Sequence, residues 1–102
     1  MIRVSVLYPA GDGKTFDIAY YCEKHMPLVR RLLGDAVKGL TVDSGIAAGD
    51  GSAAPYLAIG SIVFDSVDAF HSSFGPHAPQ IMGDIPNYTN VQPTLQISEI
   101  KM

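Results

Sequence analysis

The sequence has one cysteine, no run of basic residues and no long apolar run, and each absence narrows the possible functions. Cys22 is the only cysteine among 102 residues, so an intramolecular disulfide is impossible and a reducing compartment is favoured. Seven basic residues against ten acidic ones give a net charge of -3, which predicts no nucleic-acid partner. No apolar run approaches the ~20 residues of a membrane span, and the first residues lack a signal-peptide pattern. We therefore expect a cytoplasmic protein without a nucleic-acid or membrane partner.

The sequence also lacks the spacings of metal and phosphate sites. The three histidines, His25, His71 and His77, are not spaced to place two ligands on one face of a helix. The segment 11–15 ends in Gly-Lys-Thr, but Tyr8 stands where a phosphate-binding loop needs its first glycine. We therefore predict neither a metal nor a cofactor.

Apolar residues, by contrast, are plentiful for a short chain. They make up 47% of the sequence, while charged residues make up 17%. A chain of this length buries only roughly 60–70% of the surface that its unfolded form exposes, and large apolar patches left outside usually mark interfaces. We expect one domain over residues 1–102 whose remaining apolar surface meets a partner subunit.

Hydrophobic periodicity predicts four strands. Alternating patterns and one continuous apolar run place them at residues 2–8, 40–44, 56–64 and 94–100. Between the first two strands and between the last two, the apolar period changes to three and four residues, which is typical of helices. The order β-α-β-β-α-β is that of the split βαβ, ferredoxin-like sandwich, an α+β fold with two helices on one face of a sheet.

Capping residues bound the predicted helices. Asp17 is the expected N-cap of the first helix and Gly34 its C-terminal stop. Ser66 is the expected cap of the second helix, which the Gly75-Pro76 pair interrupts before a further helical piece at residues 77–82.

The sheet face without helices has a mixed composition. Its candidate residues are Ser5, Leu7, Thr41, Asp43, Ser61, Val63, Gln96 and Ser98. A face that is neither fully polar nor fully apolar often packs on another sheet or encloses a cavity. We therefore expect a homodimer through the sheet face, with two sheets forming a dimeric α/β barrel.

The first predicted helix carries the strongest chemical signal of the chain, a histidine on an apolar stripe. The stripe consists of Ile18, Tyr21, Cys22, His25, Val29 and Leu32. Pro27 cannot donate to the carbonyl of Glu23, so the helix either kinks or restarts with Pro27 in its first turn. Partial burial would lower the pKa of His25 and keep it a neutral base near pH 7. His25 is thus the candidate catalytic acid/base, and the alternative is a core histidine bonded to a backbone carbonyl.

Neighbouring residues have competing interpretations. Tyr21, four residues before His25, either lines a pocket or packs in the core. His77 either reaches the same pocket or lies at the surface, and His71 is expected to be exposed. Cys22 is expected to be a buried thiol rather than the nucleophile of a Cys-His pair.

The turn-rich segment before the last strand supplies further candidates. Tyr88 could donate a hydrogen bond to a bound carbonyl or phenol. Asn87 is a candidate pocket residue, although ordinary turn chemistry is the favoured explanation for both Asn87 and Asp84.

At this level of detail the chain resembles the EthD family, named for ethyl tert-butyl ether degradation, along nearly its whole length. The matching segments are Val4–Tyr8, Phe16–Tyr21, His25–Val29, Phe64–Phe70, Pro76–Ala78, Ile81–Met82 and Asp84–Thr89. The resemblance implies the dimeric α/β-barrel superfamily and a hydrophobic pocket between helices and sheet with His25 at its wall. Relatives with that fold include cofactor-free quinol monooxygenases, muconolactone isomerases and haem-binding chlorite dismutases.

Two functions of different classes follow. In the first, a homodimer binds a small hydrophobic or oxygenated organic molecule, and His25 moves a proton in an isomerase, lyase or cofactor-free monooxygenase reaction of ether or aromatic catabolism. In the second, the protein is a non-catalytic binding or accessory protein of an oxidative degradation pathway. Haem binding is a third possibility, against which the small size of the chain argues.

Overall fold

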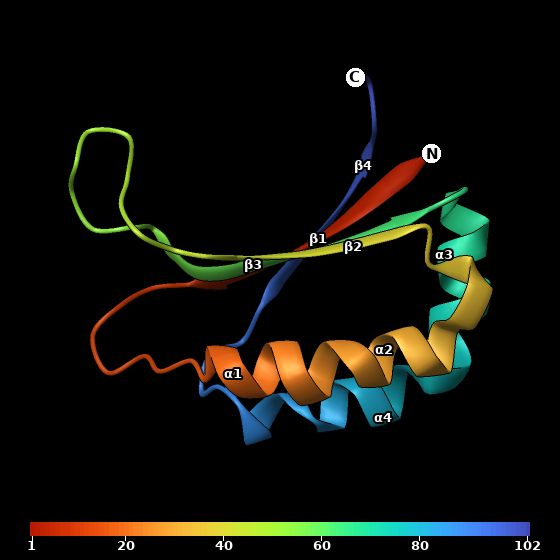
Figure 1. Cartoon of the computed structure of the whole chain (residues 1–102), viewed down its shortest axis with the longest axis horizontal. Helices are drawn as coiled ribbons and strands as arrows, with labels where there is room; N and C mark the ends of the chain where they lie inside the picture. Colours follow the sequence, from red (N-terminus) through yellow and green to blue (C-terminus); the bar gives the residue numbers. More distant parts are fainter.

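The computed structural model describes all residues from Met1 to Met102 and shows a four-stranded antiparallel sheet with helices on one face (Figure 1). The strands are β1 (Ile2–Pro9), β2 (Gly39–Ser44), β3 (Tyr56–Phe64) and β4 (Thr94–Glu99). Their order in the sheet is β2-β3-β1-β4, and all neighbours are antiparallel. The predicted α+β, ferredoxin-like fold is confirmed, and each strand end lies within one residue of its predicted position.

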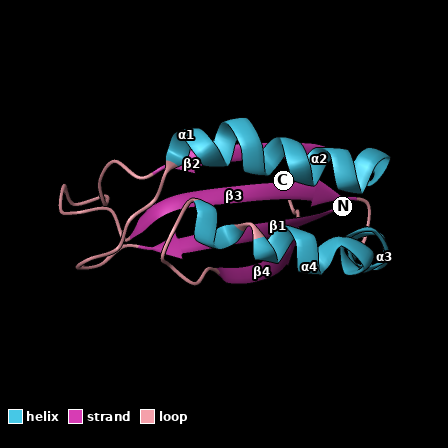
Figure 2. Cartoon of the chain, turned by 90° about the horizontal axis from the view of Figure 1, so that it is seen from below, coloured by secondary structure: helices cyan, strands magenta, loops and turns pink.

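The helices form two rows along the same face of the sheet (Figure 2). They are α1 (Ile18–Tyr20), α2 (Met26–Leu33), α3 (Val67–Phe74) and α4 (Ala78–Gly83), with a π-helical turn at Tyr21–His25 and 3-10 turns at Gly34–Ala36, Gly75–His77 and Ile85–Asn87. One row contains α1, the π turn and α2, and the other contains α3 and α4. None of these helices has both the length and the apolar character that crossing a bilayer needs.

The predicted caps are confirmed. The Asp17 carboxylate accepts a hydrogen bond from the backbone N–H of Tyr20 at 3.0 Å. The Ser66 hydroxyl accepts one from the N–H of Ala69 at 3.0 Å. Gly34 ends α2 with a φ of +58°, a conformation that suits glycine.

Pro27 is accommodated by the π turn that precedes it. The N–H of Met26 bonds to the carbonyl of Tyr21, five residues back, and Pro27 lies in the first turn of α2, where its missing N–H does no harm. Of the two predicted outcomes, the restart is therefore observed.

The π turn also moves the buried face of this helical segment. Tyr21 and His25, four residues apart, still lie one above the other, and their rings stack at 5.4 Å with an interplanar angle of 12°. Because the π turn holds more residues than an α turn, the residues on either side of Tyr21 change the direction in which they point. Cys22 falls beside this line and is exposed, and Ile18 is 37% exposed. The prediction of a buried Cys22 was wrong, because the apolar stripe was drawn for a regular α-helix.

The two faces of the sheet differ in character. Val4 and Tyr8 of β1 and Ile62 and Phe64 of β3 face the helices and are buried. The opposite side, here called the open face, alternates with them along each strand. Its eight predicted residues share it, as the strand register shows: Ser5, Leu7, Thr41, Asp43, Ser61, Val63, Gln96 and Ser98.

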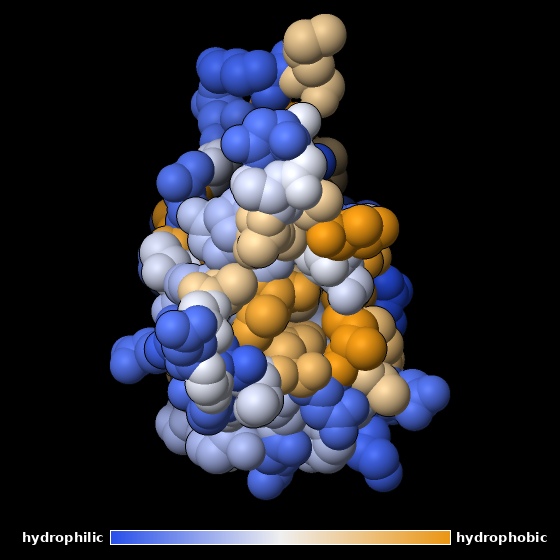
Figure 3. Space-filling view, turned by 90° about the vertical axis from the view of Figure 1, so that its left-hand side faces the viewer, coloured by the Kyte–Doolittle hydropathy of each residue, from blue (hydrophilic) through white to orange (hydrophobic).

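Apolar side chains also reach the surface at one end of the molecule. Figure 3 views the end at which the loop between β2 and β3 projects, and apolar atoms gather in its middle, framed by hydrophilic ones. In that loop Ile46 is 95% exposed. The fold therefore leaves apolar surface outside the helix–sheet core.

Candidate functional site

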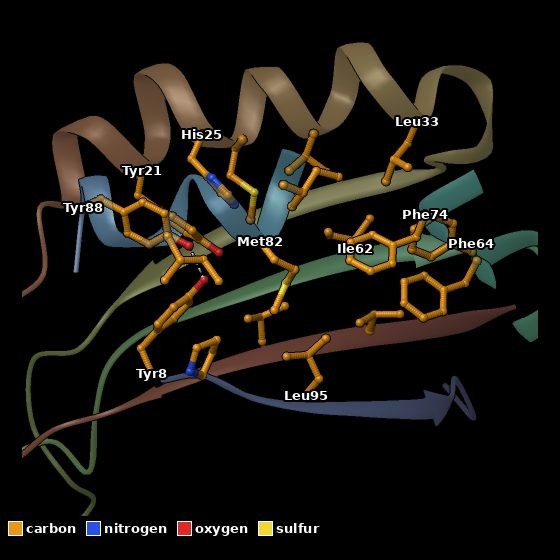
Figure 4. Close-up of a pocket in the computed structure, with 18 residues that line it drawn as sticks. Tyr8, Tyr21, His25, Leu33, Ile62, Phe64, Phe74, Met82, Tyr88 and Leu95 are labelled. Atoms are coloured by element: carbon orange, nitrogen blue, oxygen red, sulfur yellow. Dashed lines mark hydrogen bonds between the residues drawn. The ribbon is translucent and has the colours of Figure 1, made fainter. Parts of the chain in front are cut away.

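An apolar cavity of about 50 Å³ lies between the helices and the sheet (Figure 4). Met82 of α4 and Leu95 of β4 line it and remain 43% and 42% exposed, so the cavity opens to solvent between these two elements. A water molecule needs roughly 10–15 Å³ of such volume, so the closed cavity has room for only a few. A larger guest requires side chains to move, and the flexible thioether of Met82 at the opening can do so.

His25 reaches this cavity from the π turn, and its ring is fixed by a carboxylate. Its Nδ1 lies 2.9 Å from Oδ2 of Asp84, and the two side chains are 5% and 14% exposed. An ionised carboxylate only accepts hydrogen bonds, so Nδ1–H donates and Nε2 carries the lone pair. Nε2 has no protein partner, yet no buried side-chain polar atom lacks one. Nε2 is therefore open to the cavity that His25 lines.

Asp84 is held in its ionised form by three donors. Besides His25, the Tyr20 hydroxyl donates to its Oδ1 at 2.7 Å and the Asn87 side-chain amide donates at 2.9 Å. Burial alone would raise the pKa of Asp84, but the hydrogen bonds from Asn87, His25 and Tyr20 outweigh it and lower the pKa below its ordinary value. The carboxylate is therefore a permanent acceptor for the imidazole at neutral pH.

His25 itself is a neutral base at pH 7. Burial lowers its pKa below the ordinary value of 6.5, and this effect outweighs the hydrogen bond and the negative charge of Asp84, which both raise it. A neutral imidazole with Nδ1 occupied and Nε2 free has the arrangement of a general base.

Tyrosine hydroxyls gather at the same end of the cavity, which we call the tyrosine end and define by Tyr8, Tyr21, His25 and Tyr88 (Figure 4). The hydroxyls of Tyr8 and Tyr88 are hydrogen-bonded at 2.7 Å. Burial raises the pKa of Tyr8, Tyr21 and Tyr88, so all three remain protonated at neutral pH. Gly60 of β3 makes room here, because a Cβ at this position would collide with the Tyr21 hydroxyl.

The structure separates the predicted site residues into two groups. Tyr21, His25 and Tyr88 line the cavity together. Asn87 is exposed and reaches the site only through its hydrogen bond to Asp84. His77 is half-buried and does not line the cavity, and no group of histidine, cysteine, aspartate or glutamate side chains is placed to hold a metal ion.

Sequence reasoning missed three members of the site. Turn chemistry was the favoured explanation for Asp84, but its carboxylate binds His25, so the alternative of a backbone-bonded histidine was also wrong. Tyr20 lies outside the apolar stripe predicted for the first helix, yet its hydroxyl donates to Asp84. Tyr8 had a usable signal, because it occupies the buried phase of the first strand, where its hydroxyl needs a partner.

Comparisons with known proteins identify the family and the fold. The EthD domain family matches residues 14–92. The crystal structure of an EthD-like protein from Ralstonia eutropha JMP134 is 41% identical and superposes with a TM-score of 0.93, covering 99% of this chain and 92% of that one. No curated protein matches the chain.

More distant structures share the fold alone. An EthD family protein from Bacillus halodurans C-125 is 16% identical with a TM-score of 0.69, covering 98% of each chain. HapK from Hahella chejuensis is 14% identical with a TM-score of 0.56, covering 100% of this chain and 95% of that one.

Proposed function

The chain belongs to the EthD family, and from this premise we propose that it binds a small, mostly apolar organic molecule in the helix–sheet cavity, where His25 transfers a proton without a cofactor. The observation that supports this proposal is the His25–Asp84 pair at 2.9 Å, with Nε2 open to an apolar cavity. The reaction is of the isomerase, lyase or monooxygenase type. The family name suggests that its setting is the catabolism of ethers or aromatic compounds.

The residues around His25 have distinct parts in this proposal. Nε2 of His25 takes a proton from the bound molecule and returns it, as a general base and then a general acid. Asp84 is a positioning residue, because it holds the ring and the Nδ1–H tautomer. The apolar walls exclude water, which strengthens each electrostatic interaction inside the cavity.

The working unit in this proposal is a homodimer that packs open face to open face. Leu7, Ile59 and Val63 lie on the two central strands of that face, while polar residues such as Thr41 and Gln96 lie on the edge strands. An apolar centre with a polar rim is the usual anatomy of a protein interface.

Replacement of His25 tests the catalytic proposal. The molecule that co-purifies with the protein is identified by mass spectrometry, and its conversion is compared for the wild type, His25→Gln and the control His71→Gln, whose histidine is exposed. We expect His25→Gln to lower kcat by about 10²- to 10⁴-fold, with little change in ligand affinity. Ligand binding without turnover by the wild type would instead support the non-catalytic binding protein.

Light scattering tests the dimer separately. We expect a dimer at micromolar concentration that Ile59→Lys dissociates, because a charge in the apolar centre of an interface loses its water. Val67→Lys, on the exposed start of α3, should leave the dimer intact. A monomeric wild type would refute the packing of two open faces.

A further inference from the structure

Three protonated hydroxyls lie beside the only imidazole of an otherwise apolar cavity. They come from separate parts of the chain, Tyr8 from β1, Tyr21 from the π turn and Tyr88 from the segment before β4. Figure 4 shows the hydroxyls of these labelled tyrosines pointing toward one another, with the His25 ring next to them. The centroid of the His25 ring is 4.7 Å from that of Tyr88 and 5.4 Å from that of Tyr21.

The Tyr8–Tyr88 pair leaves a proton to spare. Two hydroxyls 2.7 Å apart share one hydrogen bond, and either oxygen can be the donor. The Tyr21 hydroxyl is also hydrogen-bonded to that of Tyr8. Two hydrogen bonds therefore join three hydroxyls, and one of the three protons is left without a protein acceptor. A buried donor without an acceptor is costly, so this end of the cavity favours a guest that brings an oxygen.

We propose that the Tyr8–Tyr88 hydroxyl pair binds the carbonyl oxygen of the guest, and that the substrates of this site are enolisable carbonyl compounds. The catalytic half of this inference rests on the proposed function, because His25 is the base. The binding half depends only on the hydroxyl pair and can be tested without turnover.

The resulting step is balanced within the site. Nε2 of His25 takes a proton from the carbon next to the carbonyl, so that the C–H bond breaks and its electron pair forms the carbon–carbon double bond of an enolate. The carbonyl π electrons move to the oxygen, where the tyrosine O–H group stabilises the developing charge. Return of the proton from Nε2 to a carbon of the same molecule completes an isomerisation without an oxidant or a co-reactant.

Protonation states favour this division of roles. Burial raises the pKa of Tyr8 and Tyr88, so both stay donors. Burial lowers the pKa of His25, so it stays a base over the same pH range. The carboxylate of Asp84 already accepts hydrogen bonds from three donors. Because its contact with His25 is made through Nδ1, Nε2 stays free to act as the base.

Binding is tested with cyclohexanone and with methylenecyclohexane, which has the same shape without the oxygen. By NMR titration we expect the wild type to prefer the ketone. Tyr8→Phe should weaken ketone binding about 3- to 10-fold, the effect of one neutral hydrogen bond, and leave the hydrocarbon unchanged. Tyr88→Phe should act in the same way, and Tyr56→Phe, in β3 outside the cavity, should change neither. A wild type without preference for the ketone, or equal losses for both probes, would overturn the carbonyl site.

Catalysis is tested by exchange of the α-hydrogens of cyclohexanone in D₂O. We expect exchange above the uncatalysed rate, about 10²- to 10³-fold slower in Tyr8→Phe and unaffected in Tyr56→Phe. No exchange by the wild type overturns the enolisation step. If His25→Gln leaves exchange unchanged while Tyr8→Phe still weakens ketone binding, the proposed base fails and the carbonyl site stands. If His25→Gln abolishes exchange while Tyr8→Phe alters neither measurement, the carbonyl site fails and the proposed base stands.

Discussion

The two ends of the cavity are built from the same sheet and the same helices, yet they are held together differently. One end, here called the hydrocarbon end, is lined by Val29, Leu33, Ile62, Phe64 and Phe70, which have no polar side-chain atoms. The tyrosine end instead depends on hydrogen bonds between residues far apart in sequence, such as Tyr8 with Tyr88 and His25 with Asp84.

This difference teaches how a small domain separates stability from chemistry. The hydrocarbon end gains free energy from every buried carbon, so its contribution to stability depends on volume and packing. The tyrosine end gains little net free energy from its hydrogen bonds, but losing one partner leaves a buried polar group unsatisfied. The two ends should therefore respond to different substitutions.

The largest effect on stability should come from truncating a side chain of the hydrocarbon end. Phe64 is fully buried, and Phe64→Ala should lower the free energy of unfolding by about 3–5 kcal/mol because it leaves a cavity. Urea unfolding measures this, with Val67→Ala at an exposed helix start as the control. A loss of unfolding free energy below about 1 kcal/mol would mean that the hydrocarbon end is loosely packed.

A smaller loss is expected when the tyrosine end loses its carboxylate. Asp84→Ala leaves Nδ1–H of His25 and the Tyr20 hydroxyl without their acceptor and should cost about 1.5–3 kcal/mol, the range for hydrogen bonds to a charged group. The matched control is Asp12→Ala, an exposed loop carboxylate. Equal effects of the two variants in urea unfolding would show that Asp84 does not support His25.

The pH dependence of stability should belong to the tyrosine end. The folded pKa of His25 lies below its ordinary value of 6.5, so below pH 6.5 the unfolded chain binds a proton that the folded chain resists. Stability should fall from about pH 6.5 downward, by at most about 1.4 kcal/mol per pH unit. Asp84 has a lowered pKa as well, and its contribution is present above pH 3.8 and lost only below that value.

Unfolding measured at pH 7 and at pH 5 checks this dependence. His25→Gln should flatten the difference between the two pH values, and His71→Gln, with its exposed histidine, should not. An unchanged difference in His25→Gln would assign the pH dependence to other groups.

The smallest effect should come from removing one hydroxyl. Tyr8→Phe keeps the ring and its edge-to-face contacts with Phe16 and Tyr21 and loses the hydroxyl with its hydrogen bonds to Tyr88, at 2.7 Å, and to Tyr21. We expect a loss of about 0.5–1.5 kcal/mol in the free energy of unfolding. A loss as large as that of Phe64→Ala would show that the two ends are not distinct in their energetics.

The elements of the fold could be predicted because their signals are local. Alternation along β3 and the caps Asp17 and Ser66 are readable within a few residues. The hydrocarbon end could be predicted from the same periodicity, since its residues repeat at the helix and strand spacings.

The tyrosine end could be predicted only in part. His25 and Tyr21 follow from helix spacing, but Asp84 lies 59 residues beyond His25, and no local pattern joins them. The exposure of Cys22 depends on the π turn, for which Pro27 was the single indication. Pairings that form only when distant segments meet are set by the packed fold rather than by any one stretch of sequence.

The π turn makes the direction of the Tyr21 side chain a matter of counting residues. If the residues Tyr21–His25 formed a regular α-helix, which turns by about 100° per residue, they would wind further than they do in the wider π turn, and everything before them would rotate relative to α2. Tyr21 would swing away from Gly60 and from the Tyr8–Tyr88 pair, while α2 and the hydrocarbon end kept their places. A change in the winding of one turn would thus dismantle the site and leave the fold in place.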